Sequence, residues 1–175
     1  MTQAPPNSEN EFSRPVDRNR MGDGEWQIEA DEAERAALAR RFGLVSIERL
    51  EADLLLAEDG EAVTAKGMMH AAFVQSCAVS GDDLPVAVEE PIAFRFVPKG
   101  TYNPDEEIEL SEADCDAIEY AGSVFDLGEA VAQSLALAID PYATGPNADR
   151  IRKDAGLLDE QDTGPFAALK GLIRE

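Results

Sequence analysis

The pattern of apolar and polar residues predicts three long strands in the middle of the chain. Val45–Leu54 alternates imperfectly, Val63–Val79 contains an apolar stretch over 71–79 typical of a central strand, and Val86–Val97 is the third run; clusters of Gly, Asp and Glu separate the three. Three consecutive strands with tight turns predict an antiparallel meander, because parallel pairing needs longer crossover connections. Gly67 marks a bulge or a close approach, and Pro91 is expected to interrupt the third strand.

Two segments change to a helical period. Residues 31–42 begin at Asp31, have Glu34 in the capping-box position and end at Gly43. Residues 127–139 begin after Asp126 and stop before Asp140-Pro141, and their apolar stripe is Leu127, Val131, Leu135 and Ala138. A short hairpin is predicted across residues 118–125, and another short helix near the C-terminus, over residues 165–174.

These elements predict an α+β fold: an antiparallel sheet, open or curled into a half-open barrel, flanked by two or three helices. Residues 1–10 are polar and proline-bearing, which indicates a disordered tail. Residues 11–175 are expected to form a single domain, with mobile loops near 98–111 and 143–162.

The charge is unusual. The 175 residues include 36 acidic and 15 basic side chains, a formal net charge of −21. Such a polyanion repels nucleic acid and anionic membranes over most of its surface and favours basic partners. No membrane span or signal peptide is evident and there are only two cysteines, so the cytoplasm is the expected location.

The residues with catalytic potential are few and isolated. His70 is the only histidine, and neither Cys77 nor Cys115 belongs to a CxxC pair, so no triad, zinc site or other cofactor site is predicted. Cys77 lies in an apolar run and is interpreted as a small buried side chain, whereas the acidic neighbours of Cys115 disfavour its thiolate. The pattern predicts a protein that is not an enzyme.

Two sets of charged residues are candidates for binding a partner. Basic residues gather in a flexible arm and beside the first helix, at Arg14, Arg18, Arg20, Arg40 and Arg41. An acidic loop contributes Glu106, Glu107 and Glu109. The arginines would suit phosphates, and the loop would suit a basic protein; solvated helix charges and a solvated loop are the simpler alternatives.

Several ordered motifs run along the chain from Phe12. They are Phe12-Ser13-Arg14-Pro15-Val16, Gln75-x-Cys77, Phe94-Arg95-Phe96, Asp126-Leu127-Gly128-Glu129, Asp140-Pro141-Tyr142, Pro146-Asn147-Ala148 and Pro165-Phe166-Ala167. In this combination the chain resembles the YceD family of large ribosomal RNA subunit accumulation proteins, formerly a domain of unknown function, in its alphaproteobacterial-type branch. Some of that family's members carry paired cysteines that look like a zinc site. Here Ser80 stands in place of one cysteine and the later pair is absent, so a metal is not carried over.

The resemblance implies a non-catalytic factor that supports accumulation of large-subunit ribosomal RNA. The charge of −21 argues against a broad RNA-binding surface, since RNA binding relies on cations. We therefore expect the partner to be a basic large-subunit ribosomal protein or a pre-subunit particle, with direct RNA contact limited to a local arginine patch. The alternative is a general acidic interaction module, or nucleic-acid mimic, for basic proteins unrelated to ribosomes.

Overall fold

The computed structural model describes residues 11–22, 24–100 and 117–156. The chain divides into two compact units. The first takes in residues 1–75 and 85–139, and the second takes in residues 76–84 and 140–175. The predicted tail, the acidic residues of the loop, Cys115 and the C-terminal helix all lie outside the described residues.

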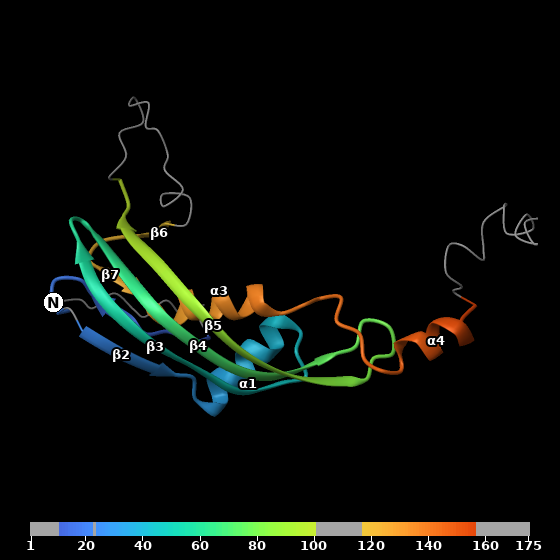
Figure 1. Cartoon of the computed structure of the whole chain (residues 1–175). Helices are drawn as coiled ribbons and strands as arrows, with labels where there is room; N and C mark the ends of the chain where they lie inside the picture. The colour runs from blue at the N-terminus through green and yellow to red at the C-terminus, as the bar shows by residue number, and fades with distance from the viewer. Residues whose placement is uncertain (1–10, 23, 101–116, 157–175) are drawn as a thin grey trace, which may run out of the picture. The chain divides into compact units, whose positions relative to one another are not determined.

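The main sheet has five strands in the order β2-β3-β4-β5-β6 (Figure 1). Their bounds are β2 Gly24–Glu29, β3 Ser46–Asp59, β4 Ala62–Ser76, β5 Asp83–Pro98 and β6 Ala117–Tyr120. β3 is antiparallel to both β2 and β4, whereas β6 runs parallel to β5. A separate two-stranded sheet pairs β1 (Pro15–Asp17) with β7 (Val124–Asp126). The predicted α+β class is confirmed, and the sheet is not closed.

The predicted hairpin over residues 118–125 is wrong. β6 joins β5 in the main sheet, and β7 joins β1 in the small sheet. The predicted interruption at Pro91 is also wrong, because β5 runs through it. β6 pairs with β5 only from Arg95 to Pro98, so the proline lies beyond the part of β5 that pairs with β6.

The core of the first unit lies against one face of the sheet. Alternate side chains of β3 and β4 turn inward, and side chains of α1 (Glu32–Phe42) and α3 (Leu127–Ala138) join the same core. The largest fully buried members are Phe12, Leu38, Leu50, Leu56, Val63, Met69, Phe73, Phe96, Leu127, Val131 and Leu135. The stripe predicted for the second helix is therefore a true core face for its three larger members.

The predicted signals at the ends of the first helix act as expected, whereas at the second helix the aspartate caps the helix but the capping box predicted with Glu129 is wrong. Asp31 accepts a hydrogen bond from the N–H of Glu34, whose carboxylate accepts one from the N–H of Asp31, which completes a capping box. Gly43 ends α1 with a left-handed φ of 68°. Asp126 caps α3 through the N–H of Glu129, but the Glu129 side chain turns elsewhere.

Gly67 is the predicted point of close approach. A Cβ there would lie 1.8 Å from the carbonyl oxygen of Asp53 on the neighbouring strand. Only glycine permits that approach, so the tight β3–β4 pairing at this point depends on it.

The second unit contains a tight turn and a short helix. The turn links Cys77 to Asp82 and Gly81, and α4 spans Ala148–Asp154. The prediction of an unstructured loop over 143–162 is wrong for α4, where an Asp149–Arg152 ion pair one turn apart supports helix. No helix in the described ranges is long and apolar enough to cross a membrane.

Candidate functional site

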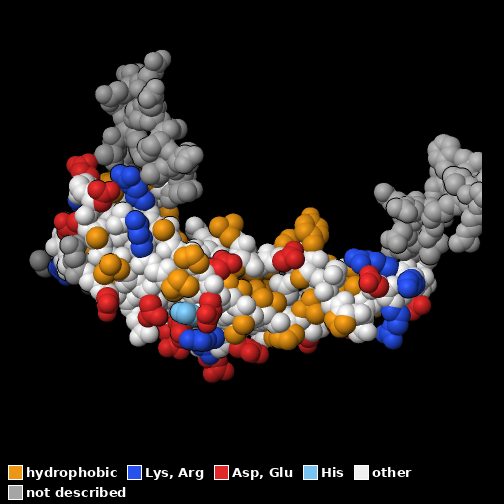
Figure 2. Space-filling view, in the orientation of Figure 1, with side chains coloured by type: hydrophobic (Ala, Val, Ile, Leu, Met, Phe, Trp, Pro, Cys, Tyr) orange, Lys and Arg blue, Asp and Glu red, His pale blue; other side chains and the backbone are white. Residues whose placement is uncertain are grey.

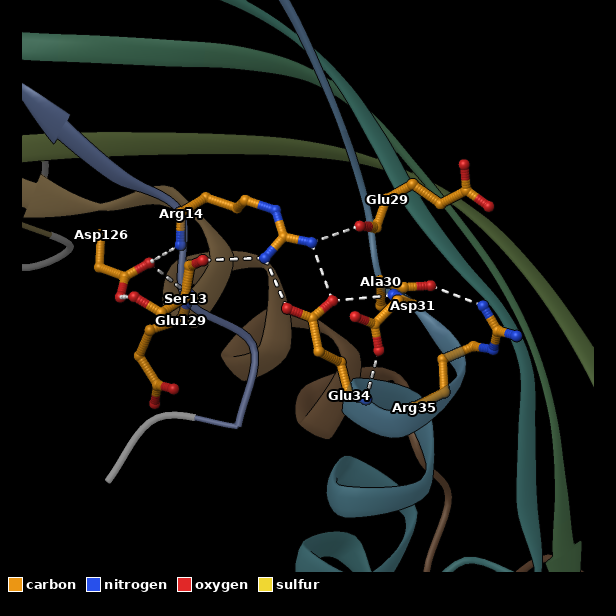
Figure 3. Close-up of polar contacts among 9 residues, drawn as sticks. All are labelled: Ser13, Arg14, Glu29, Ala30, Asp31, Glu34, Arg35, Asp126 and Glu129. Carbon is orange, nitrogen blue, oxygen red and sulfur yellow. Dashed lines mark hydrogen bonds and ion pairs between the residues drawn. The ribbon is translucent and has the colours of Figure 1, made fainter. Parts of the chain in front are cut away.

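Arg14 lies where the N-terminal segment passes the start of α1 (Figure 3). Its guanidinium binds both carboxylate oxygens of Glu34, at 2.6 and 2.8 Å. It also donates to the carbonyl oxygens of Ser13 and Glu29. Arginine suits this place because its planar fork matches a carboxylate and still has donors for carbonyls. The predicted flexible arm is therefore wrong for this segment, in which Phe12 is fully buried and residues 15–17 form β1.

Asp126 holds the same segment against the start of α3. Its carboxylate accepts hydrogen bonds from the Ser13 hydroxyl at 2.6 Å and from the N–H of Arg14 at 2.8 Å. The next residue but one, Gly128, leaves no room for a side chain, since a Cβ would lie 2.5 Å from the Phe12 carbonyl oxygen. The motifs around Phe12 and Asp126, 112 to 113 residues apart where they bond, thus form one contact.

Arg41 closes a second link, between α1 and α3. Its guanidinium donates to both oxygens of Glu129, at 2.8 and 2.9 Å, and to Glu11 at 3.1 Å. We define the signature network as Ser13, Arg14, Glu34, Arg41, Asp126 and Glu129. Its members tie the N-terminal segment, α1 and α3 together.

The ion pairs of the signature network shift the acidity of their members. Hydrogen bonds from Arg14 lower the pKa of Glu34, and those from Arg41 lower the pKa of Glu129. The same bonds raise the pKa of each arginine. Both pairs are fully charged at neutral pH and hold each other, which is the arrangement of a structural clamp.

The five candidate arginines therefore differ in what they can offer a partner. Arg14 and Arg41 are engaged inside the chain. Arg18 donates to the carbonyl of Gly60, and Arg20 lies 3.6 Å from Asp17, while Arg40 is exposed on α1. The structure does not gather them into one patch of free guanidinium groups. The acidic candidates Glu106, Glu107 and Glu109 lie outside the described residues.

Carboxylates instead gather on the outer face of the main sheet, opposite the core. We define the acidic face as the outward side chains of Glu25, Glu29, Glu51, Asp53 and Glu89. The strand register places Glu29 opposite Glu51 and Glu51 opposite His70. Figure 2 shows red side chains around the single histidine on this side of the molecule. Alternation in the sequence indicated Glu51, Asp53 and Glu89, which occupy polar positions of predicted strands, whereas β2, which carries Glu25 and Glu29, was not predicted.

His70 belongs to the acidic face. Its Nε2 lies 4.0 Å from Asp53 and its Nδ1 lies 3.5 Å from Glu89. No nucleophilic side chain is among these contacts, so the arrangement is not that of a triad. In the described part of the chain, no group of three or more His, Cys, Asp and Glu side chains is placed to hold a metal ion.

Cys77 lies in the turn of the second unit. It is buried, as predicted, but its sulfur also accepts backbone N–H groups from Ser80 and Gly145, each at 3.3 Å. Hydrogen bonds from the Ser80 side chain and from these two amides lower the pKa of the thiol to about 6. The predicted burial of Cys77 is confirmed, but the amides that converge on its sulfur, which the sequence did not indicate, favour the thiolate.

The remaining motif residues lie at the end of β4 and in the segment that follows α3. Gln75 is buried at the end of β4. In the second unit, Asp140 accepts the N–H of Tyr142 in a turn after α3, and Pro141, Tyr142 and Pro146 are exposed. None of them meets a catalytic group among the described residues.

The described part of the chain thus defines an α+β protein with an open sheet, an internal ionic clamp and an acidic outer face. No protein-family model, no curated protein and no solved structure matches the chain. The resemblance to the YceD family stays a prediction, carried by the ordered motifs alone.

Proposed function

We propose that this protein is a non-catalytic factor in large ribosomal subunit biogenesis, which acts in the cytoplasm by binding a basic ribosomal protein or a pre-subunit particle. The acidic face is the observation that carries the proposal. It gives a basic partner five carboxylates, of which only Glu51 is paired with an arginine of the described residues, Arg49. Charge complementarity of this kind speeds association and selects basic proteins.

The internal engagement of Arg14 and Arg41 supports a protein partner over RNA. Each phosphate contact needs a cation that can leave water and meet the backbone. Two of the five candidate arginines already satisfy carboxylates, and the chain carries a net charge of −21. Direct contact with RNA is limited to Arg18, Arg20 and Arg40 in this proposal.

A salt series tests the partner. Purified protein is titrated with large-subunit ribosomal proteins and with ribosomal RNA fragments between about 50 and 200 mM salt. We expect salt-sensitive binding to a ribosomal protein, weak RNA binding, and little effect of Arg18→Ala, Arg20→Ala or Arg40→Ala. Tight RNA binding whose salt slope falls by about one unit for each arginine removed would contradict the choice of partner.

The second candidate function is a general acidic interaction module for basic proteins unrelated to ribosomes. The acidic face favours it equally, because charge alone does not distinguish one basic protein from another. Sedimentation of a cell lysate on a sucrose gradient separates the two proposals. A biogenesis factor migrates with pre-large-subunit particles, whereas a general module stays at the top of the gradient.

A further inference from the structure

A hollow of ≈ 580 Å³ opens on the main sheet beside Gly67. Residues of β2, β3 and β4 form its walls, and the glycine contributes backbone alone. Its lining residues are Glu25, Trp26, Gln27, Asp53, Leu54, Leu55, Lys66, Gly67 and Met68. The hollow is large enough to receive a side chain and the backbone that carries it.

Two apolar side chains in this hollow are exposed to water. Leu55 is 56% exposed and Met68 is 38% exposed. Leu55 pairs with Lys66 and Asp53 pairs with Met68, so the leucine and the methionine are diagonal neighbours on one face. Single exposed apolar residues need no explanation, but two neighbours in one concave site indicate a contact surface.

The charge around the apolar pair is predominantly negative. Glu25 and Asp53 line the hollow itself, and Glu29, Glu51 and Glu89 continue the acidic face beyond it. Lys66 is the one cation in the lining, while Arg49 and Arg95 of the neighbouring sheet positions are paired with Glu51 and Asp59. A ligand for this site therefore needs positive charge next to apolar surface.

We propose that this hollow is the docking site for an arginine or lysine side chain in an extended, basic and apolar segment of a partner protein. The aliphatic stem lies against Leu55 and Met68, and the charged head meets Glu25 and Asp53. The proposal deepens the proposed function and rests on it for the partner's identity. A second copy of this chain is a poor occupant because two acidic faces repel each other, and RNA is repelled for the same reason.

The test uses the full chain and two synthetic ten-residue peptides of equal charge. One alternates arginine with leucine, and the other alternates arginine with serine. Fluorescence anisotropy in low salt measures affinity. We expect the arginine–leucine peptide to bind more tightly. Leu55→Ser and Met68→Ser should each weaken it about fivefold or more, and leave the arginine–serine peptide nearly unchanged.

Removing a negative charge from the hollow should weaken peptide binding, and removing its positive charge should strengthen it. Asp53→Asn and Glu25→Gln should weaken both peptides by roughly three- to tenfold, whereas Lys66→Ala should strengthen both. Matched controls lie elsewhere on the first unit: Leu137→Ser removes an exposed leucine from α3, and Glu119→Gln removes an exposed carboxylate from β6. Equal losses for the controls and the hollow variants would overturn the site.

Large-subunit ribosomal proteins as a second set of probes keep the two proposals apart. Peptide binding that depends on the hollow, without binding of any ribosomal protein, would support the site and contradict the proposed function. A ribosomal protein that binds with unchanged affinity to Leu55→Ser, Met68→Ser and Asp53→Asn would support the proposed function and contradict the site. Circular dichroism and unfolding of each variant confirm that an effect on binding is not a loss of fold.

Discussion

At the scale of single residues, the guanidinium of Arg14 donates four hydrogen bonds inside the chain, two of them to Glu34. Arg14→Ala should lower the free energy of unfolding by about 1–3 kcal/mol, because it removes two hydrogen bonds to the Glu34 carboxylate and one to each of two carbonyls. Urea unfolding measures the loss. Arg20→Ala is the control, since that side chain is 88% exposed and its one ion pair, with Asp17, is long at 3.6 Å. This substitution should lower the free energy of unfolding by about 0.5 kcal/mol or less. Equal losses would mean that the Arg14 clamp is not formed.

The lowered pKa of Glu129 predicts a pH-dependent contribution. A carboxyl whose pKa is lower in the folded than in the unfolded chain adds stability above the unfolded value, about 4.3, and loses it as pH falls through the folded value. The deficit of Glu129→Gln relative to the native chain should therefore be full at pH 7 and shrink as pH falls below about 4.3. Unfolding curves of both proteins across this range provide the test. A deficit that does not change with pH would mean that the Arg41–Glu129 pair contributes little.

Gly128 permits the N-terminal segment to pass the first turn of α3. Gly128→Ala would place a Cβ 2.5 Å from the carbonyl oxygen of Phe12, and backbone cannot move aside as a side-chain tip can. We expect a loss of about 1–3 kcal/mol in the free energy of unfolding. Gly22→Ala is the matched control, because a Cβ there meets nothing within 4 Å, and it should be neutral or slightly stabilising.

At the scale of elements, α3 offers two leucines two positions apart with opposite surroundings. Leu135 is fully buried, whereas Leu137 is 88% exposed. Leu135→Ala should cost about 2–5 kcal/mol, since it removes core contacts and leaves a cavity. Leu137→Ala should change the free energy of unfolding by no more than about 0.5 kcal/mol. Denaturant unfolding of the two variants decides whether the apolar stripe of this helix faces the core.

Elements with a strong local signal could be predicted from the sequence. Asp31 and Asp126 mark the starts of two helices, because the side-chain oxygen of an N-cap residue accepts a hydrogen bond from a backbone amide that is otherwise unpaired in the first turn. The partner strands of β6 and of β7 could not be predicted, since strands of four and three residues carry little information about register. Their partners are set by core packing, where Phe125 stacks on Phe96 of β5 at 4.4 Å between ring centroids.

The candidate site was harder to predict than the fold. A cluster of arginines in the sequence does not reveal that Arg14 binds a glutamate 20 residues later or that Arg41 binds one 88 residues later. The acidic face was accessible in principle. Strand alternation puts Glu51 and Asp53 on one side, but only the register between strands brings Glu29 and His70 beside them.

At the scale of the whole molecule, the net charge of −21 sets a general electrostatic cost on the folded state. Added salt screens repulsion between exposed carboxylates more than it weakens partly buried pairs such as Arg14–Glu34. We therefore expect the midpoint of thermal unfolding to rise when NaCl is increased from about 0.02 to 0.3 M. A falling midpoint would mean that favourable ion pairs outweigh the self-repulsion.

The contact between the Phe12 segment and the start of α3 also has a consequence in time. A ribosome releases the N-terminal segment first, yet Asp126 and Gly128, which hold it, are made more than a hundred residues later. At about 5–20 residues per second that delay is on the order of 5–25 s. During it, Val16 lacks its partner strand β7 and Phe12 lacks α3, so we expect the earliest part of the chain to be among the last to fold and to be open to chaperones or proteases until then.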